Sequence, residues 1–328
     1  MKRANYLIEH IADMENLRIA FWKASRGKTA KPEVETFRRS LDKNLILLRN
    51  SILDGKISTG KYHYFTIYDP KERKICAASF DERVLHHAII NICHANFEKY
   101  QIFDSYACRL QKGTYAALDR AKYYQHKYNW FLKLDVRKYF DSIDHQVLKQ
   151  MLQCRFKEKN LLNIFCDIID SYETNTEKGV PIGNLTSQYF ANHYLAHADH
   201  YIKEKLGAPD YVRYMDDMVI WSNDKTQLLE TGKKFESFIS EKLHLTLKPF
   251  CLNTAEKGLP FLGYLLYPCK TRLRQHSKIR FATKFKYYTN KLHNEEWTQT
   301  EYQQHILPLI SFTKYANTFE LRQQIIKN

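Results

Sequence analysis

Hydrophobic side chains recur at helical spacing through the first 57 residues. One helical face is clear between residues 41 and 52, and Gly55 is placed to end that helix. The apolar positions on this face are Leu41, Leu45, Leu48 and Ile52. The pattern therefore predicts a helical N-terminal segment.

Between residues 61 and 80 the pattern changes to short apolar stretches. Residues 62–68 and 75–80 are rich in apolar and aromatic side chains, whereas the segment between them, 69–74, is polar and contains Pro70. Two apolar stretches joined in this way predict a β-hairpin with a basic tip. Residues 81–100 return to helical spacing and predict a helix.

The middle of the chain alternates strand and helix patterns. Residues 131–134 are a short apolar strand that runs into Asp135. A loop is predicted at 179–183, and the next helix is expected to be capped by Thr186 or Ser187. The other predicted elements are an amphipathic helix over 147–156, strands over 211–215, 218–222 and 261–267, a helix over 226–243 and a basic helical tail from about residue 270. Together they indicate an α+β protein with an antiparallel sheet in its middle.

Composition favours a globular protein with a polyphosphate partner. Of the 328 residues, 51 are Lys or Arg and 36 are Asp or Glu, which gives a net charge of +15. A basic surface favours nucleic acid because bound phosphates release their counterions. The 23 Tyr and 19 Phe can stack on unpaired bases.

The lengths of the apolar runs and the spacing of the cysteines bear on the localisation of the protein. No apolar run approaches the roughly 20 residues of a membrane span, so no membrane partner is expected. The seven cysteines contain no C-x-x-C pair and predict reduced thiols. A cytoplasmic protein, encoded by a bacterium or a phage, is expected.

Asp216 and Asp217 are adjacent carboxylates between two apolar strands. A surface turn would explain an isolated pair, because Asp is a favoured turn residue. Here the flanking strands are apolar enough to be buried, and Asp135 ends another apolar strand. If the strands are neighbours, Asp135 and Asp216 project from the same end of one sheet. Such a group of carboxylates is expensive to assemble without a cation, because like charges repel.

A carboxylate cluster of this kind suits magnesium and phosphoryl transfer. Magnesium is typically held by a few carboxylates together with substrate phosphates. Two such ions can activate an attacking hydroxyl and stabilise a departing pyrophosphate. Basic side chains must then hold the triphosphate, and the candidates are Lys71, Arg73 and Lys74 at the hairpin tip, with Arg109.

Four segments resemble the motifs of reverse transcriptases, in the order in which that family has them. Residues 134–141 (LDVRKYFD) resemble polymerase motif A, 179–188 (GVPIGNLTSQ) motif B and 214–217 (YMDD) motif C. The segment Phe261-Leu262-Gly263-Tyr264 resembles the primer-grip hairpin. The resemblance covers about residues 60–268. It implies a right-hand polymerase fold, with N-terminal helices and fingers (1–128), a palm (129–268) that contains an inserted finger segment (about 146–178), and a small helical thumb (269–328).

The resemblance also implies a role for each motif residue. Asp135 and Asp216 would ligate two Mg²⁺ ions, for which Mn²⁺ can substitute, with Asp217 and the Val136 carbonyl completing the site. Phe140 occupies the position at which a bulky ring excludes the ribose 2′-hydroxyl. Two more roles, in the nucleotide site, fall to Lys248, which would protonate pyrophosphate, and to Gln188. The implied partners are an RNA template, a DNA or RNA primer and dNTPs.

Motif B departs from the form found in most reverse transcriptases. Ile182 stands where group II intron and retroviral enzymes have Gln, and Gln188 stands where the wider family has Pro. This form resembles the error-prone, adenine-mutagenic enzymes of diversity-generating retroelements, which act in mutagenic retrohoming with a small basic accessory protein. An aliphatic side chain in place of Gln cannot form the hydrogen bond by which Gln discriminates between incoming nucleotides. The alternative is that Ile182 is a packing variant in a faithful enzyme.

Three other functions stay open at this point. The first is another bacterial reverse transcriptase, of the group II intron or antiphage defence type. The second is an RNA-dependent RNA polymerase, against which Phe140 argues. The third is an RNA-binding protein without polymerase activity, against which the intact Asp135, Asp216 and Asp217 argue.

Overall fold

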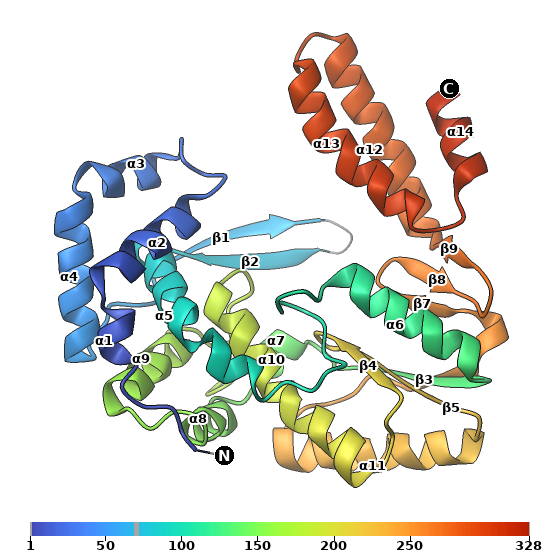
Figure 1. Cartoon of the computed structure of the whole chain (residues 1–328), viewed down its shortest axis with the longest axis horizontal. Coiled ribbons are helices and arrows are strands. Elements are labelled where there is room, and N and C mark those ends of the chain that lie inside the picture. Colours follow the sequence, from blue (N-terminus) through green and yellow to red (C-terminus); the bar gives the residue numbers. More distant parts are fainter. Residues whose placement is uncertain (1, 69–71, 328) are drawn as a thin grey trace.

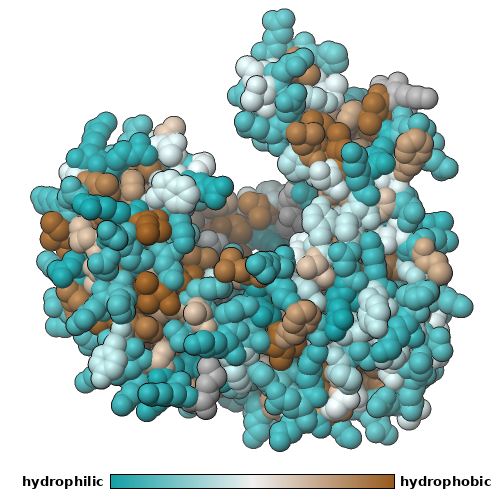
Figure 2. All heavy atoms as spheres, viewed as in Figure 1, coloured by the Kyte–Doolittle hydropathy of each residue, from teal (hydrophilic) through white to brown (hydrophobic). Residues whose placement is uncertain are grey.

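The computed structural model describes residues 2–68 and 72–327. In Figure 1 the chain forms an N-terminal part, a central sheet with its helices, and a C-terminal group of helices that stands away from the N-terminal part. Figure 2 shows an open cleft between these two outer parts. None of the helices in the described ranges is long and apolar enough to cross a membrane.

The N-terminal part consists of helices around one hairpin. Its elements are α1 (Ile8–Ile11), α2 (Met14–Ser25), α3 (Pro32–Arg39), α4 (Leu41–Asp54), β1 (Tyr62–Ile67), β2 (Arg73–Ala78) and α5 (Phe80–Glu98). The predicted stop of α4 is confirmed, because Gly55 has φ +65° and its amide donates to the Ile52 carbonyl. Only glycine adopts this left-handed conformation without strain. The predicted hairpin is also confirmed, and β1 and β2 pair in antiparallel fashion.

The central part is a four-stranded antiparallel sheet with helices against it. Its elements are α6 (Thr114–Lys127), β3 (Trp130–Asp135), α7 (Tyr139–Ser142), α8 (His145–Gln153), α9 (Lys159–Asp170), α10 (Leu185–His200), the π-helix η1 (Tyr201–Lys205), β4 (Tyr211–Tyr214), β5 (Asp217–Ser222), α11 (Lys225–Leu243) and β6 (Cys251–Thr254). The strand order is β4-β5-β3-β6. The antiparallel sheet expected from the sequence is therefore present.

The C-terminal part begins with a second, smaller sheet. Its elements are the 3₁₀ turn η2 (Ala255–Lys257), β7 (Leu259–Phe261), β8 (Tyr264–Leu266), β9 (Thr271–Leu273), α12 (Gln275–His293), α13 (Gln299–Lys314) and α14 (Phe319–Lys327). The single strand predicted over 261–267 is wrong. Leu262 and Gly263 have φ +46° and +90°, and two successive positive φ angles reverse the chain into a hairpin.

A second prediction that fails concerns the start of α10. The helix begins at Leu185 with Asn184 as its N-cap, so Thr186 and Ser187 lie inside the first turn and are buried. The Asn184 side chain does not cap the helix. Its Oδ1 accepts instead from the amide of Ala78 on β2, at 3.0 Å. The side chain of the N-cap residue is thus used in a tertiary contact to the hairpin, which the sequence pattern of α10 alone does not reveal.

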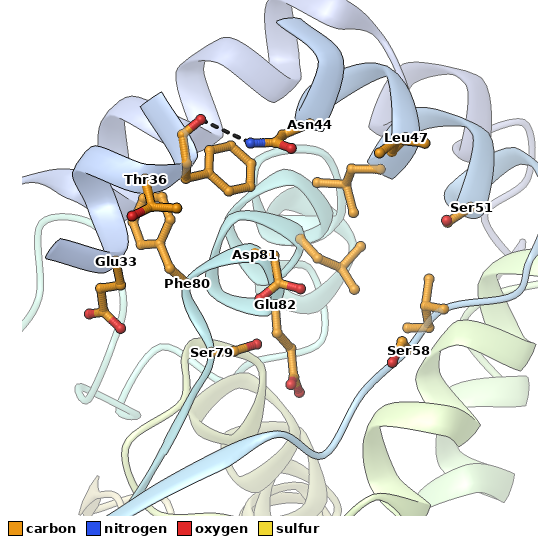
Figure 3. Close-up of a pocket in the computed structure, with 14 residues that line it drawn as sticks. Glu33, Thr36, Asn44, Leu47, Ser51, Ser58, Ser79, Phe80, Asp81 and Glu82 are labelled. Carbon is orange, nitrogen blue, oxygen red and sulfur yellow. Dashed lines mark hydrogen bonds between the residues drawn. The ribbon is translucent and has the colours of Figure 1, made fainter. Parts of the chain in front are cut away.

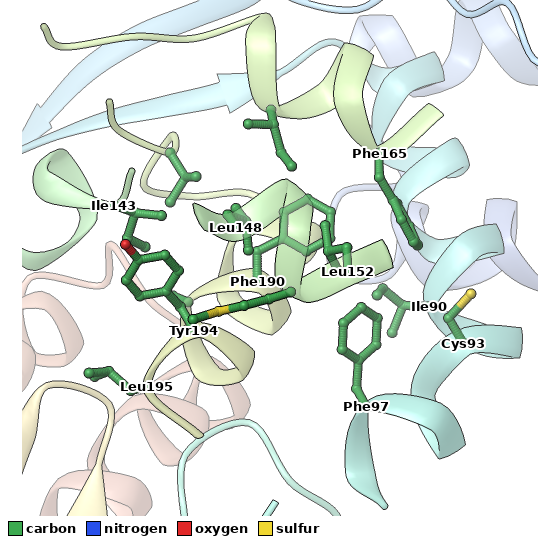
Figure 4. Close-up of a cluster of buried hydrophobic side chains, with 14 of the residues drawn as sticks. Ile90, Cys93, Phe97, Ile143, Leu148, Leu152, Phe165, Phe190, Tyr194 and Leu195 are labelled. Atoms are coloured by element: carbon green, nitrogen blue, oxygen red, sulfur yellow. The ribbon is translucent and has the colours of Figure 1, made fainter. Parts of the chain in front are cut away.

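Two hydrophobic clusters hold these parts together. The larger cluster runs from the N-terminal helices through α8, α9 and α10 to α11. Figure 4 shows Phe97 of α5, Phe165 of α9 and Phe190 of α10 facing one another within it. The ring centroids of Phe165 and Phe190 are 5.5 Å apart, in an edge-to-face arrangement. The smaller cluster joins α6 and the other side of the central sheet to β7–β9 and α13.

Candidate active site

The three predicted carboxylates come together at one end of the central sheet. Strands β3 and β5 pair so that Asp135 lies directly opposite Asp217. Asp216 lies in the turn between β4 and β5, beside Met215, whose φ is +54°. A β-branched or bulky side chain is uncommon at positive φ, so this turn is held in a strained conformation.

A fully buried arginine holds the strained turn from behind. Arg213 on β4 donates to the carbonyl of Met215 at 3.1 Å. Its guanidinium also forms two hydrogen bonds of 2.7 and 2.6 Å to the carboxylate of Asp199 on α10, and neither side chain is exposed. The paired Asp199 charge raises the pKa of Arg213, against burial, which acts to lower it. Arg213 therefore fixes the position from which Asp216 projects. It carries no motif signal other than its place directly before the YMDD segment.

Lys248 lies beside Asp135. Its amide donates to the Asp135 carbonyl at 2.8 Å, and its ammonium Nζ lies 2.8 Å from Asp135 Oδ1. The segment around Leu247 runs antiparallel to Val136, so these backbone bonds place the lysine at the carboxylates. The bonds of this bridge use the Asp135 carbonyl and the Arg137 amide, not the Val136 carbonyl.

Lys133 is a site residue that the sequence reasoning missed. Its Nζ lies 2.9 Å from Asp217 Oδ1 and 3.0 Å from Oδ2, and it also donates to the Pro260 carbonyl at 2.7 Å. A lysine inside the apolar strand 131–134 was the available signal, because a half-buried ammonium needs a partner.

The electrostatics of the carboxylates favour a cation. Burial raises the pKa of Asp216, and repulsion by Asp135 raises it further, whereas Lys248 and Arg73 act in the opposite direction. Burial also raises the pKa of Asp217 to about 6, despite the ammonium of Lys133. A divalent ion between Asp135 and Asp216 would relieve this repulsion.

The donor set fits a magnesium-type ion that takes part of its shell from a substrate. Within residues 2–68 and 72–327, no group of three or more His, Cys, Asp or Glu side chains is gathered tightly enough to hold a metal ion by itself. Asp135 and Asp217 are each paired with a lysine instead. Magnesium commonly uses one or two carboxylates with substrate phosphates and water. Asp135, Asp216 and the Val136 carbonyl supply oxygen donors of this kind.

The motif B loop lies against the N-terminal hairpin. The Ile182 carbonyl accepts from the Cys76 amide at 2.8 Å, and the Ile182 side chain is partly exposed. Gln188 is also partly exposed, and its Oε1 accepts from the Cys108 thiol at 3.2 Å. Phe140 is half-buried beside this loop, and its carbonyl accepts from the Val180 amide at 2.9 Å. The motif A and motif B segments thus meet at this hydrogen bond.

Comparison with known families decides what this site belongs to. The family model described as reverse transcriptase (RNA-dependent DNA polymerase) matches residues 68–266, which is more than half of the chain and includes all three carboxylates. The chain belongs to the reverse transcriptase family. Its α+β architecture, with a hairpin-bearing N-terminal part, a central antiparallel sheet and C-terminal helices, is the right-hand fold expected for a reverse transcriptase.

Individual relatives of this reverse transcriptase are distant. The group II intron-encoded protein LtrA of Lactococcus lactis subsp. cremoris is 24% identical over 225 residues, which cover 66% of this chain and 36% of LtrA. The COX1/OXI3 intron 2 protein of Saccharomyces cerevisiae is 30% identical over 109 residues, or 31% of this chain and 13% of the yeast protein. The chain therefore spans about a third or less of these relatives.

Solved structures also resemble this reverse transcriptase. Apo telomerase from Candida tropicalis aligns with a TM-score of 0.49 at 13% identity, over 71% of this chain and 53% of that chain. The same telomerase without its C-terminal domain aligns with a TM-score of 0.49 at 14% identity, over 66% and 55%.

The four residues of the predicted primer grip divide into two kinds. Phe261 and Tyr264 are fully buried in the smaller hydrophobic cluster, so their side chains have a structural role in this reverse transcriptase. Leu262 and Gly263 form the partly exposed turn between β7 and β8. The Gly263 carbonyl accepts from Ser277 Oγ at 2.8 Å, which ties the turn to α12. Of these four residues, only the two in the turn are partly exposed to solvent.

The basic residues predicted to bind the triphosphate differ in where the structure places them. Arg73 on β2 is close enough to Asp216 to lower its pKa, and the Lys74 ammonium lies 4.6 Å from the centre of the Tyr64 ring. Lys71 lies outside the described residues. Arg109 is directed elsewhere: it donates to Glu98 at 2.6 Å and to two backbone carbonyls, and its side chain is 9% exposed. We therefore leave Arg109 out of the candidate nucleotide site.

A separate cavity lies in the N-terminal part of this reverse transcriptase. It has a volume of about 580 Å³ and is lined by α3, α4 and the start of α5 (Figure 3). Among its lining residues is Glu82, whose carboxylate accepts from the Gly60 amide at 3.2 Å and whose pKa burial raises to about 7. None of the predicted site residues lines this cavity.

Proposed function

We propose that this chain is an RNA-directed DNA polymerase, which makes cDNA on an RNA template by two-metal-ion nucleotidyl transfer. The observation that carries the proposal is the opposition of Asp135 and Asp217 on paired strands, with Asp216 at the adjoining turn, inside the segment that matches the family. An RNA-binding protein without catalysis has no need to assemble three carboxylates whose mutual repulsion must be offset.

The residues of the site have distinct roles in this reaction. Asp135, Asp216 and the Val136 carbonyl would hold two magnesium ions, or manganese in their place. These ions, when bound, lower the pKa of the primer 3′-hydroxyl and stabilise the leaving pyrophosphate. Arg73 and Lys74, with Lys71 near them in the sequence, bind the triphosphate. Lys248 is placed to give a proton to the departing pyrophosphate.

The sugar and the duplex are recognised by other parts of the chain. The ring of Phe140 excludes a ribose 2′-hydroxyl and so selects dNTPs. The proposed fingers are residues 1–128, the palm 129–268 with an inserted segment at about 146–178, and the thumb 269–328. The turn at Leu262 and Gly263 contacts the primer.

Primer extension on an RNA template tests this proposal. The purified chain should incorporate dNTPs and not rNTPs in the presence of Mg²⁺ or Mn²⁺, and Asp135→Asn should abolish the product. Absence of dNTP incorporation with either metal would disprove polymerase activity. Preferential use of rNTPs would instead indicate an RNA-dependent RNA polymerase.

Within the family, we propose the error-prone enzyme of a diversity-generating retroelement, which acts with a small basic accessory protein. Ile182 and Gln188 support this assignment, because both depart from the usual motif B. An aliphatic side chain at 182 offers no hydrogen bond with which to test the incoming nucleotide or the template base. Sequencing of the cDNA should show errors concentrated opposite template adenines, and Ile182→Gln should reduce them.

The similarity to LtrA favours a second candidate, a reverse transcriptase of the group II intron type. In that case Ile182 is a packing variant in a faithful enzyme. Errors spread evenly over the four template bases, unchanged by Ile182→Gln, would support this candidate and contradict the retroelement assignment.

A further inference from the structure

Lys133 connects the central sheet to the smaller sheet, which follows β6 in the chain after the short turn η2. Its ammonium lies 2.9 and 3.0 Å from the two carboxylate oxygens of Asp217 and 2.7 Å from the Pro260 carbonyl. Asp217 begins β5 of the central sheet, whereas Pro260 lies in β7 of the smaller sheet. The two sheets thus share a polar contact at one ammonium group.

This contact lies where the position of the second sheet matters for catalysis. Lys133 is two residues before Asp135 on β3, and Pro260 is two residues before Leu262 in the turn of the grip hairpin. A strand advances roughly 3.3 Å per residue, so each of these separations is about 7 Å. Because Pro260 is this close to the turn, any shift of β7 at Pro260 would carry the turn with it and change the position of the turn relative to the carboxylates.

The contact is charged and partly shielded from solvent, so it can fix the two sheets in one relative position. Hydrogen bonds between an ammonium and a carboxylate are short and stronger than neutral ones. The side chain of Lys133 is only 17% exposed, and that of Asp217 is 24% exposed, so solvent screens the pair less than it screens a surface pair. The hydrophobic contacts of the smaller cluster bring the sheets together but do not define one relative position as sharply.

From these contacts we infer that Lys133 is a positioning residue, which fixes the primer-grip hairpin relative to the catalytic carboxylates through Asp217 and the Pro260 carbonyl. The inference rests on the proposed function, because it assigns the link a role in placing the primer 3′ end. Asp217 acts here as the anchor of the link.

Hydrogen exchange of the hairpin tests the link without any need for catalysis. In protein free of metal and nucleic acid, Lys133→Met should speed exchange at the amides of residue 259 and residues 261–266 by roughly tenfold, because the charged contact to β7 is lost. Lys149→Met is the matched control. Lys149 also pairs with an aspartate, at 2.6 Å from Asp170, and its side chain is 18% exposed, but it lies on α8. The control should leave hairpin exchange unchanged.

Steady-state kinetics test the positioning role. Lys133→Met should raise the KM for primer–template by about tenfold or more and leave the KM for dNTP within about twofold. Lys133→Arg keeps a cation that can reach both partners and should recover most of the primer affinity. The double variant Lys133→Met/Asp217→Asn should show hairpin exchange no faster than that of Lys133→Met alone, because both changes remove the same link.

The outcomes separate the link from the proposed function. If hairpin exchange in Lys133→Met matches that of the wild type and of Lys149→Met, the inference is overturned. It is also overturned if exchange rises but the KM for primer–template does not. If the wild-type chain incorporates no dNTP, the proposed function fails, and the positioning role fails with it even where exchange reveals the contact.

Discussion

The ammonium of Lys248 lies 2.8 Å from Oδ1 of Asp135, one of the carboxylates proposed to hold a metal ion. Both side chains are partly exposed, at 44% and 35%, and such pairs contribute at most about 1 kcal/mol. A cation that binds Oδ1 of Asp135 competes with this ammonium for the same oxygen. Lys248 is then free to face the pyrophosphate.

Lys248→Met should therefore strengthen metal binding while it weakens catalysis. We expect the Kd for Mn²⁺, measured by electron paramagnetic resonance without nucleic acid, to fall by about two- to fivefold, since a pair of this kind contributes up to about 1 kcal/mol. The rate of dNTP incorporation should fall in the same variant. Lys149→Met serves as the control and should change neither quantity. Weaker Mn²⁺ binding by Lys248→Met would show that the lysine does not compete with the cation.

Asp216→Asn should trade activity for stability. Burial and the charge of Asp135 raise the pKa of Asp216, so the ionised form is less favourable in the folded state than in the unfolded state. At a pH above the folded pKa, Asp216 is ionised and the folded state bears the full free-energy cost of that charge. The neutral variant avoids this cost, so it should unfold at a temperature about 2 °C higher at pH 8. Incorporation should drop by about 10³-fold or more. Calorimetry and primer extension measure the two effects, and a lower unfolding temperature would refute the electrostatic argument.

Phe140→Ala should relax the choice of sugar. The ring is half-buried beside the motif B loop, and its removal opens space for a 2′-hydroxyl. We expect the ratio of kcat/KM for dNTP over rNTP to fall by about ten- to a hundredfold, a range typical of steric discrimination by a pocket. An unchanged ratio, with the fold intact by circular dichroism, would mean that another residue excludes the ribose.

Arg213→Met should destabilise the whole protein. The change leaves the fully buried Asp199 carboxylate without its guanidinium, and loss of one partner of a buried pair costs about 3–5 kcal/mol. Chemical denaturation measures this loss. The double variant with Asp199→Asn should recover a large part of the stability, because no buried charge is left unpaired. If the double variant is no more stable than Arg213→Met, the stabilisation comes from the other contacts of Arg213, such as the one to Met215.

Glu82→Gln should change how stability depends on pH. The pKa of Glu82 is raised by burial to about 7 from an ordinary 4.5, so the folded state binds more protons than the unfolded state between these values. The Glu82 carboxyl therefore adds to the free energy of unfolding below about pH 4.5, and this contribution is lost as the pH rises through 7. The groups around the carboxylate are His86, Asp81 and the amides of Gly60 and Lys61.

The measurement is the difference in unfolding free energy between wild type and Glu82→Gln across pH. From pH 4.5 to pH 8 the variant should gain about 3 kcal/mol relative to wild type. His86 acts in the other direction in both proteins, because burial lowers its pKa to about 3 and its contribution is lost on acidification below 6.5. The difference between the two proteins removes that common effect. A difference that stays constant over this range would show that Glu82 is ionised normally in the folded state.

Several local features could be predicted from the sequence because they depend on neighbours along the chain. The period of apolar positions identified the hairpin at 62–78, the strand that ends at Asp135 and the strands around Asp216. A glycine after a helical run identified the end of α4 at Gly55. Each signal comes from backbone geometry that a few adjacent residues determine.

The functions of individual charged and aromatic side chains depended on tertiary structure. Arg109 looked free to bind a triphosphate, yet Glu98 and two carbonyls use its donors. Phe261 and Tyr264 were predicted to belong to a primer grip, yet the side chains of both lie in the smaller hydrophobic cluster. A spacing rule gives the side of a strand on which a residue lies, but not what stands opposite.

The carboxylates at the end of the sheet show both contributions at once. The sequence alone determined that Asp135, Asp216 and Asp217 follow or join apolar strands, which is enough to predict a cation site suited to phosphoryl transfer, and the motif resemblance added the polymerase. Only the tertiary structure decided that Lys248 faces Asp135 and that Lys133 joins Asp217 to Pro260. The reason is that an ion pair depends on the distance between groups far apart in the chain, and folding alone sets that distance.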